Sequence, residues 1–478
     1  MLAIGAIASP DRLSRLALLL DPTVIAALLA VEAALFAWRL GAVADAFRRG
    51  EGATSGRAAS LTAIGLVLVL VPSVYAAYLT ELAREAALTV FAKVEQPYVP
   101  PAAPSLAPDD SLGPPTATFS PPPELGRFTV LLIGADSGPG RDHALTDTMI
   151  VASLDPIAHS VSMVSVPRDT VDLPLPDGRI FRAKINSLVM YVEQHPDRFP
   201  GAPSGQAVLA ATLGQLLGVQ VDGWAQVNLP GFVEVVNSLG GIDVNVTDGF
   251  CDAGYDEYGI NGFAITPGRY HFDGNQALAY ARVRKAYGEN DFTRAGRQQE
   301  IVVAARDRVV GGGFLVDPAG FISAMGRLVT TSIDPSVLAE YAGAASGVSR
   351  DHVFRQVIQP PLVHSALEDA RGSIQVPDLE GIHDLGVAAF PPPGTLPVGL
   401  ATIPADPGGP TTTSLPKARC SVPKATPSPT PLRTPSSTPQ PIDTPVPSPT
   451  DKPGGGPPSP EPSIEPSPPP SVEPSTAP

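Results

Sequence analysis

The sequence predicts an α/β domain, a layered sheet flanked by helices, which follows two transmembrane helices and precedes a disordered Pro-rich tail. Short runs rich in Val and Ile at 128–133, 148–153 and 161–166 are bounded by Gly and Pro, which is typical of buried strands. Further on, 224–246 has the pattern strand, helix, Gly-Gly stop, strand, and such alternation favours an α/β layered domain.

Composition separates the folded part from the rest of the 478 residues and limits the class of function. Most of the 57 prolines lie in 96–123 and after about 415. The net charge of −15 argues against general nucleic-acid binding, which needs a basic face, although a local basic pocket stays compatible with it. The two cysteines, Cys251 and Cys420, are too few for a disulfide framework or a Cys-rich metal site. They would pair in an oxidising compartment, and the sequence leaves both states open.

Two N-terminal segments, 22–40 and 59–79, are each long and apolar enough to cross about 30 Å of hydrocarbon. The first contains Glu32, whereas the second has no charged residue. The positive-inside rule places the arginine-rich loop between them in the cytoplasm, so everything after Thr80 is predicted to be extracytoplasmic. The basic residues that decide this are Arg39, Arg48, Arg49 and Arg57, against Arg12 and Arg15 before the first segment. A pair of buried core helices is the alternative.

The chain therefore divides into five segments. Residues 1–95 form the membrane region, 96–124 a Pro-rich linker, 125–310 the main domain, 311–400 a C-terminal extension of the globular region, and 401–478 a disordered Pro/Ser/Thr-rich tail. Within the main domain we expect helices at 204–218 and 292–310. The aromatic and acidic stretch 249–262 is expected to be a surface loop.

Charged residues mark the ends of the three predicted strands. Asp136 ends the first, Asp147 precedes the second, and Arg168 follows the third. Strand ends carry much of the chemistry in open α/β sheets, so these side chains are expected on one rim, where they would suit a divalent cation and a phosphate. Hard carboxylate oxygens favour Mg²⁺ over Zn²⁺. Each aspartate taken alone is better explained as a turn cap.

A second set of polar residues follows in 282–298. Arg282 and Arg284 alternate onto one side of an extended piece. Arg294, Arg297 and Gln298 have the i, i+3, i+4 spacing of one helix face. Guanidinium groups grip phosphate with two parallel hydrogen bonds, so this set is a candidate phosphate site. The alternative is a group of surface salt bridges with Glu289, Asp291 and Glu300. The histidines show no zinc-type spacing, and the chain has no P-loop or dinucleotide fingerprint.

With these residues assembled, the chain resembles the LytR-CpsA-Psr (LCP) family of cell-envelope glycopolymer ligases. The matching motifs occur in family order across about 128–310: LLIGAD (131–136), TDTMIVASLDP (146–156), VSVPRDT (164–170), KIN (184–186), GFVEVVNSLGGIDVNV (231–246), ALAYARVR (277–284) and DFTRAGRQQ (291–299). There are departures. Gly138 stands where the family often has an arginine, with Arg141 as a substitute, and Ala183 and Ser187 replace the usual Asp and His beside KIN.

The resemblance implies transfer of a glycopolymer, as glycosyl phosphate, from a polyprenyl-pyrophosphate carrier to a sugar hydroxyl of peptidoglycan at the outer face of the cell membrane. It implies Mg²⁺ (or Mn²⁺) at Asp136 and Asp147. The implied catalytic residues are Arg168, Asp147, Arg282 and Arg284, and the implied substrate-binding residues are Arg294, Arg297, Gln298, Lys184, Asn186 and Asp169. The general base stays open between Asp147, Asp169 and Asp291. The family's lipid pocket would be lined by Leu209, Leu213, Leu216, Phe232 and Val236, which read more simply as core.

The implied partners are the lipid-linked glycopolymer, peptidoglycan and the membrane, with no nucleic acid. Two rival functions remain compatible with the sequence: hydrolysis of polyprenyl pyrophosphates with water as acceptor, and non-catalytic binding of wall glycans. The family's older label as transcriptional attenuators conflicts with the predicted topology, because a domain outside the membrane cannot touch DNA.

Overall fold

The computed structural model describes residues 22–49, 56–101, 126–136, 145–403, 407–416, 420 and 464–466. The predicted glycine-rich loop with Gly138 and Arg141, most of the linker and most of the tail lie outside the described residues.

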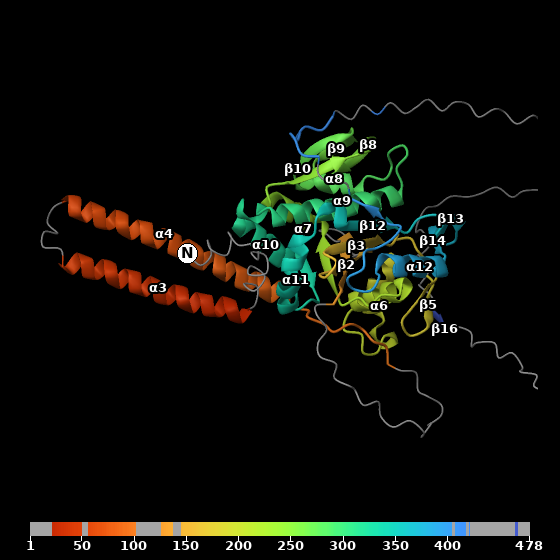
Figure 1. Cartoon of the computed structure of the whole chain (residues 1–478), viewed down its shortest axis with the longest axis horizontal. Helices are drawn as coiled ribbons and strands as arrows, with labels where there is room; N and C mark the ends of the chain where they lie inside the picture. Colours follow the sequence, from red (N-terminus) through yellow and green to blue (C-terminus); the bar gives the residue numbers. More distant parts are fainter. Residues whose placement is uncertain are drawn as a thin grey trace, which may run out of the picture.

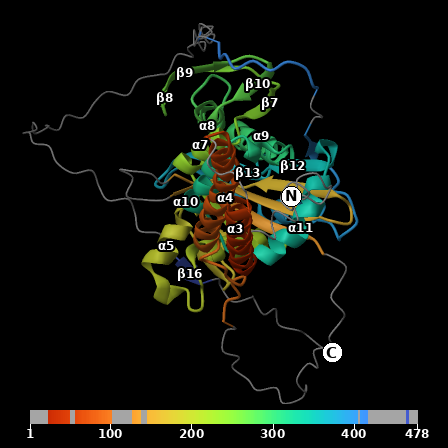
Figure 2. The same ribbon diagram turned by 90° about the vertical axis from the view of Figure 1, so that its left-hand side faces the viewer.

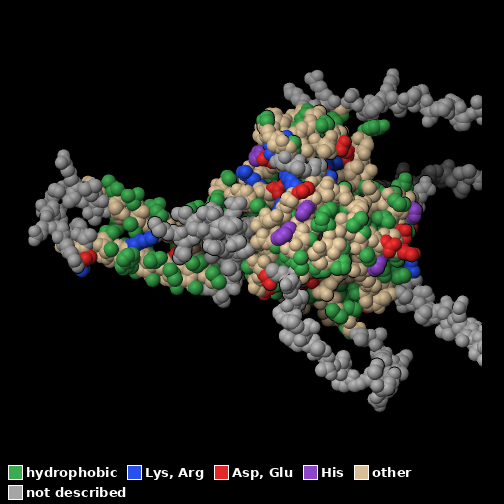
Figure 3. Space-filling view, viewed as in Figure 1, with side chains coloured by type: hydrophobic (Ala, Val, Ile, Leu, Met, Phe, Trp, Pro, Cys, Tyr) green, Lys and Arg blue, Asp and Glu red, His purple; other side chains and the backbone are tan. Residues whose placement is uncertain are grey.

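Two long helices, α3 (Pro22–Arg49) and α4 (Gly56–Val90), form an arm that extends from the globular part (Figure 1). Each has the length and hydropathy to cross a membrane, and hydrophobic side chains cover much of the arm (Figure 3). Thr80 Oγ1 donates to Glu32 Oε1 at 3.3 Å, which links the one acidic residue in the apolar part of α3 to α4. At its far end α4 packs closely on α10 (Pro318–Leu328), where a Cβ on Gly326 would lie 2.7 Å from Ala86.

The globular part is built on a seven-stranded sheet of order β11-β6-β1-β2-β3-β12-β15. The predicted strands are confirmed as β1, β2 and β3, which run antiparallel to one another, while β6 and β12 run parallel to β1 and β3. The strands are β1 (Phe128–Asp136), β2 (Leu145–Asp155), β3 (Ser160–Ser165), β6 (Gly223–Asn228), β11 (Val329–Thr331), β12 (Val353–Val357) and β15 (Ala401–Thr402).

One face of this sheet is covered by α5 (Leu188–Gln194), α6 (Gly205–Leu217) and α12 (Leu379–Ala389) (Figure 1). The predicted helix at 204–218 is confirmed as α6: Ser204 caps its first turn by accepting from Ala207 N, and Gly218 ends it with φ of 64°. Leu131, Val151 and Trp224 from the sheet pack with α6 in the main core.

The other face packs against α9 (Asp291–Val310), the predicted long helix. Val303 of α9 shares a buried cluster with Ile150 and Met163 of the sheet. Helices α7 (Leu229–Ser238) and α10 pack on each other, and α11 (Pro335–Gly347) places Tyr341 in a stack on Phe128 of β1 with ring centres 4.8 Å apart.

Beyond α9 lies a further layer of two antiparallel strand pairs and a short helix (Figure 2). These are β7 (Ile242–Val246) with β10 (Gly268–Phe272), β8 (Phe250–Glu257) with β9 (Ile260–Ile265), and α8 (Gly274–Arg282). The expected surface loop at 249–262 was wrong, because most of it forms the β8–β9 hairpin. Its aromatic residues explain this: Phe250, Tyr255 and Phe263 are buried together in the core of this layer.

Residues 311–400 add more than a surface extension. They supply β11, β12 and α12, and the hairpin of β13 (Val363–Asp369) and β14 (Gly372–Pro377). The remaining elements are short: β4 (Leu173–Pro174), β5 (Arg179–Phe181), β16 (Ile464–Pro466), which pairs with β5, and the 3₁₀ turns η1 (Ile185–Ser187), η2 (Pro196–Arg198), η3 (Gly313–Leu315) and η4 (Arg350–His352).

Part of the predicted tail lies against the globular part. β15 pairs with β12, and residues 407–416, which we call the C-terminal strap, run along β10 and the start of α8. His271 N donates to Thr412 O at 2.9 Å, and Thr412 N donates to Arg269 O at 3.0 Å. Just after the strap, Cys420 forms a disulfide with Cys251 of β8, which settles the pairing that the sequence left open.

Candidate active site

The three predicted strand ends meet on one rim of the sheet. β1 ends at Asp136, Asp147 lies near the start of β2, and the turn after β3 carries Arg168 and Asp169. Arg168 Nη1 donates to Asp147 Oδ1 at 2.8 Å, and its Nε lies 3.7 Å from Asp169 Oδ2. These three side chains are only about 15% exposed, so the expected convergence of a strand-end carboxylate with the arginine is confirmed in a partly dehydrated setting.

The KIN turn closes one side of this rim. Lys184 Nζ lies 2.8 Å from Asp169 Oδ1, and Thr146 Oγ1 donates to the carbonyl of buried Asn186 at 3.2 Å. The β13–β14 hairpin holds the turn after β3 from another side, because Gln375 N donates to Asp169 O at 2.9 Å. Lys184, Asp169 and Arg168 therefore form a chain of alternating charges whose backbone is fixed from two directions.

The second predicted set reaches the rim from α8 and α9. Arg282, the last residue of α8, places Nη1 3.6 Å from Asp136 Oδ1. Asp291 lies between Arg294 Nη2 at 3.3 Å and Arg284 Nη1 at 3.9 Å. Asp291 is the first residue of α9, where the positive end of the helix dipole favours its charge. Strand ends and helix ends thus bring both predicted sets together.

The pKa shifts of the arginines show that these groups act on one another. Burial opposes the charge of Arg168, but Asp147, Asp169 and Asp291 outweigh it and raise its pKa. Burial lowers the pKa of Arg294, with Asp291 opposing this shift and the charges of Arg168 and Arg282 adding to it. Burial would lower the pKa of Arg282, but the charges of Glu257, Asp136 and Asp147 outweigh burial and raise this pKa.

Arg297 and Gln298 lie beneath this cluster and hold the loop between α8 and α9. Arg297 Nε donates to Tyr280 O at 2.8 Å, its Nη2 donates to Val283 O, and its Nη1 pairs with Glu289. Its guanidinium carbon also lies 4.4 Å from the centre of the Phe250 ring. Gln298 Nε2 donates to Ala281 O at 3.3 Å. Arg297 and Gln298 therefore support the backbone from which Arg282 and Arg284 project.

Sequence reasoning missed one charged residue of the site. Glu257, at the end of β8, places Oε2 2.9 Å from Arg282 Nε. It was missed because it lies in the stretch expected to be a surface loop, outside the motifs that carry the family resemblance. The aromatic residues Phe250, Tyr255 and Phe263 on either side of Tyr258-Gly259 were the available signal for a hairpin that would carry it inward.

Charge is balanced across the described part of the site. Five basic side chains face five carboxylates, each within 4 Å of a partner. They are Arg168, Lys184, Arg282, Arg284 and Arg294, against Asp136, Asp147, Asp169, Glu257 and Asp291. An incoming anion would have to take arginines from carboxylates, and a cation could then take up the released carboxylate charge. The described residues contain no group of three or more His, Cys, Asp or Glu that could hold a metal unaided.

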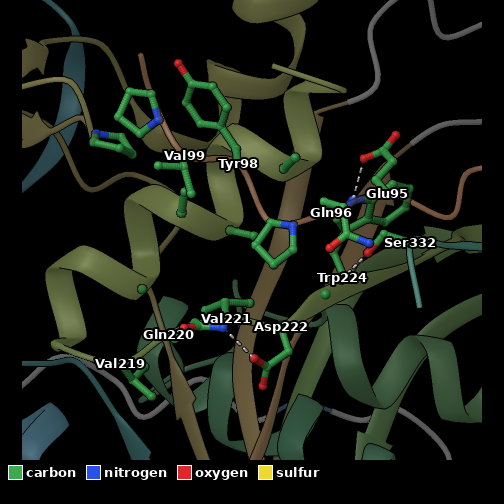
Figure 4. A pocket seen from close by; sticks show the side chains of 18 residues that line it. Glu95, Gln96, Tyr98, Val99, Val219, Gln220, Val221, Asp222, Trp224 and Ser332 are labelled. Atoms are coloured by element: carbon green, nitrogen blue, oxygen red, sulfur yellow. Dashed lines mark hydrogen bonds between the residues drawn. The ribbon is translucent and has the colours of Figure 1, made fainter. Parts of the chain in front are cut away.

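A cavity in the described part of the chain lies near the start of β6, at the strand ends away from the rim. It measures about 460 Å³ and is lined by residues 95–100, by the Ala207–Gly214 side of α6, and by the start of β6 (Figure 4). Glu95 borders it and accepts from Ser204 Oγ at 2.7 Å and from Trp224 Nε1 at 3.2 Å. Of the residues considered for a lipid pocket, Leu209, Leu213, Leu216 and Val236 are fully packed core and Phe232 is partly buried against it.

Comparison with known proteins identifies the family of this chain. The model of the LytR_cpsA_psr family matches residues 108–370, which is more than half of the chain. The chain belongs to the LytR_cpsA_psr family. This match extends past 310 into the β13–β14 hairpin, in keeping with the contact of that hairpin with Asp169.

Several relatives of this LytR_cpsA_psr protein are named polyisoprenyl-teichoic acid–peptidoglycan teichoic acid transferases. TagU of Halalkalibacterium halodurans is 29% identical over 228 residues, 47% of this chain and 68% of that protein. TagU of Bacillus subtilis is 34% identical over 175 residues, 37% of this chain and 50% of that protein, and TagV of the same organism is 32% identical over 183 residues, 38% and 44% of the two chains. The chain thus spans about half the length of the two Bacillus subtilis relatives.

Solved structures were also matched. The crystal structure of Bacillus subtilis TagV aligns with 55% of this chain and 97% of its own, at 24% identity and a TM-score of 0.42. A structure of TagT bound to LI-WTA aligns with 55% of this chain and 91% of its own, at 19% identity and a TM-score of 0.41.

Proposed function

We propose that this protein is a membrane-anchored, extracytoplasmic phosphotransferase that moves a glycopolymer from a polyprenyl-pyrophosphate carrier onto peptidoglycan. The observation that carries the proposal is the balanced cluster on the rim. In it, Arg168 and Arg282 pair with the strand-end aspartates Asp147 and Asp136, and Arg294 of α9 pairs with Asp291. Family membership and the names of the TagU and TagV relatives support the same substrate and acceptor classes.

The arginines suit a pyrophosphate for a physical reason. Phosphoryl transfer depends mainly on positioning and on stabilising charge that spreads over the phosphoryl oxygens. Arg168, Arg282 and Arg294 are mostly buried, so their charges act in a site from which much water is excluded. Arg284, with 42% of its side chain exposed, lies at the open side, where the ligand would enter.

The carboxylates suit a magnesium ion bound together with the substrate. Asp136 and Asp147 come from adjacent antiparallel strands, and each faces an arginine in the described site. When the pyrophosphate takes those arginines, two hard carboxylate oxygens become available, and Mg²⁺ commonly binds through one or two carboxylates plus substrate phosphates. The bound ion would neutralise charge on the pyrophosphate. Asp136 and Asp147 are thus the residues that would hold it.

The proposed step forms one bond and breaks one bond. The oxygen of a peptidoglycan sugar hydroxyl attacks the phosphorus next to the glycopolymer, and the bond from that phosphorus to the bridging pyrophosphate oxygen breaks. Polyprenyl phosphate leaves, and a carboxylate on the rim takes the hydroxyl proton. Arg168, released from Asp147 by the pyrophosphate, is placed to hold the phosphoryl group under attack.

Location outside the membrane rests on two further observations. The arm of α3 and α4 has the dimensions of a membrane hairpin, and the positive residues flanking the connecting loop favour its cytoplasmic placement. The disulfide between Cys251 and Cys420 is a feature of proteins in oxidising compartments.

The test uses the full chain in detergent with Mg²⁺, a polyprenyl-pyrophosphate-linked glycan and peptidoglycan fragments. Mass spectrometry should detect a new sugar phosphodiester whose formation stops when EDTA removes Mg²⁺. Release of polyprenyl phosphate without this adduct would replace the proposal by hydrolysis. Bound lipid without any turnover would replace it by non-catalytic binding.

A further inference from the structure

The β8–β9 hairpin reaches from the outer layer to the rim and ends beside Arg282. Glu257 Oε2 lies 2.9 Å from Arg282 Nε on one side of the guanidinium, while Asp136 Oδ1 lies 3.6 Å from Nη1 on the other. The two carboxylates belong to different elements, so Arg282 is held between the hairpin and the central sheet. Only 17% of the Arg282 side chain is exposed, against 36% for Glu257, which therefore borders solvent.

The location of Glu257 is fixed by packing and by covalent linkage. Tyr255, two residues earlier, is buried with Phe263 in the core of the outer layer, and Cys251 at the start of β8 is bonded to Cys420. The C-terminal strap that leads to Cys420 also contacts α8, since Gln276 Nε2 donates to Thr413 O at 3.2 Å. The elements that carry Arg282 and Glu257 are thus held together by one strap.

A carboxylate that holds one edge of an arginine side chain fixes the orientation of the guanidinium plane. Glu257 Oε2 lies 2.9 Å from Nε and its Oε1 accepts from Nη2 at 3.4 Å, and this leaves Nη1 directed toward Asp136 and the rim. A guanidinium fixed in this way can present parallel N–H groups to a phosphate without losing freedom at the moment of binding. When a pyrophosphate displaces Asp136 from Arg282, Glu257 is placed to keep its contact at Nε.

We propose that Glu257 is a positioning residue for the transfer reaction: it holds the Arg282 guanidinium in the orientation that binds the pyrophosphate. This inference rests on the proposed function and adds a residue from outside the motifs that mark the family in this sequence. It also gives the β8–β9 hairpin a role in the site.

The test compares two substitutions that remove the same charge. In Glu257→Gln the amide oxygen can still accept from Arg282 Nη2, whereas Glu257→Ala leaves the guanidinium without this partner. The full chain in detergent is titrated with inorganic pyrophosphate and Mg²⁺ by calorimetry. We expect Glu257→Ala to bind at least ~5-fold more weakly than Glu257→Gln, which is the scale of one hydrogen bond. The control is Glu234→Ala on α7, which removes the exposed partner of Arg327 and should bind pyrophosphate like the unchanged protein.

Equal affinities of the Ala and Gln variants would overturn the positioning role, as would failure of the unchanged protein to bind pyrophosphate. A double-mutant cycle guards against misfolding: on an Arg282→Lys background, Glu257→Ala and Glu257→Gln should bind alike, because lysine has no Nε–H edge to hold. A persisting difference would show that Glu257 acts through another group. The sugar-phosphodiester assay on the unchanged protein decides the proposed function separately, since this binding comparison needs no turnover.

Discussion

Arg168 lies between two carboxylates, with Asp147 at 2.8 Å and Asp169 at 3.7 Å. Replacing it with lysine keeps the positive charge but loses the planar fork that binds phosphate with two hydrogen bonds. We expect Arg168→Lys to lower kcat/KM for transfer at least ~100-fold, the scale of losing one preorganised donor. Melting temperature should change little. The matched control is Arg327→Lys in the exposed pair with Glu234. A variant with the unchanged rate would remove Arg168 from the reaction.

Arg297 is predicted to act through stability instead. Arg297→Lys loses the hydrogen bonds to Tyr280 O and Val283 O and the stacking on Phe250. We expect the free energy of unfolding to fall by roughly 1–3 kcal/mol, a common range for loss of a buried network. Thermal unfolding in detergent measures this. If the melting temperature stays unchanged while pyrophosphate binding is lost, Arg297 is itself a ligand of the substrate.

At this scale the sequence predicted identities better than roles. Asp147 and Arg168 were identifiable because strand ends place them on one rim, whatever the rest of the fold does. The roles of Arg294 and Arg297 were not separable, because helical spacing says which face they share but not the depth of each side chain. Glu257 was missed since its approach to Arg282 depends on a contact between segments 25 residues apart.

At the scale of elements, α12 packs tightly on α6 on the first face of the sheet. A Cβ on Gly386 would lie 1.9 Å from the backbone oxygen of Leu217. Since a backbone atom cannot rotate away, Gly386→Ala should push α12 off α6 and lower the unfolding free energy by about 2 kcal/mol or more. Thermal unfolding checks this.

Gly347→Ala is the control, because Gly347 is also a helical residue, the last of α11, but has nothing within 4 Å of its added Cβ. Equal melting temperatures for the two variants would contradict the packing described for α12.

Elements with one clear hydrophobic period were predictable from the sequence. Elements whose burial depends on contact with another element were not. The runs that became β1, β2 and β3, and the capped helix α6, carry their signals locally. The stretch 249–262 lacks a continuous apolar run, and its aromatic residues become buried only when β9 and α8 pack against them. Likewise, residues 311–400 carry no motif, yet β12 and the β13–β14 hairpin complete the sheet and the Asp169 turn.

At the scale of the whole molecule, the disulfide joins residues 169 positions apart and ties the C-terminal strap to the outer layer. Replacing Cys251 and Cys420 together with serine should lower the unfolding free energy by about 2–4 kcal/mol, the usual contribution of such a crosslink. Dithiothreitol should lower the melting temperature of the unchanged protein and leave that of the double variant where it is. No effect in either case would contradict the crosslink. The sequence could not decide this pairing, because Cys420 lies in a region with the composition of a tail.

The membrane topology makes a second prediction at this scale. Alkaline phosphatase is active only outside the cytoplasm, so we expect activity when it is fused after residue 95, beyond α4, and none when it is fused after residue 52, between the two helices. Activity in the reverse pattern would place the rim in the cytoplasm, away from peptidoglycan.

The measurement that tests the central claim most directly follows one phosphorus atom. The polyprenyl-pyrophosphate glycan is labelled with ³²P in the phosphate next to the sugar and is incubated with the full chain, Mg²⁺ and peptidoglycan fragments. Our account predicts that the label moves to the peptidoglycan fragment together with the glycan, and that polyprenyl phosphate is released unlabelled. Label that stays with the lipid while the glycan moves would mean glycosyl transfer, and would contradict the assignment of the arginine rim to phosphoryl transfer.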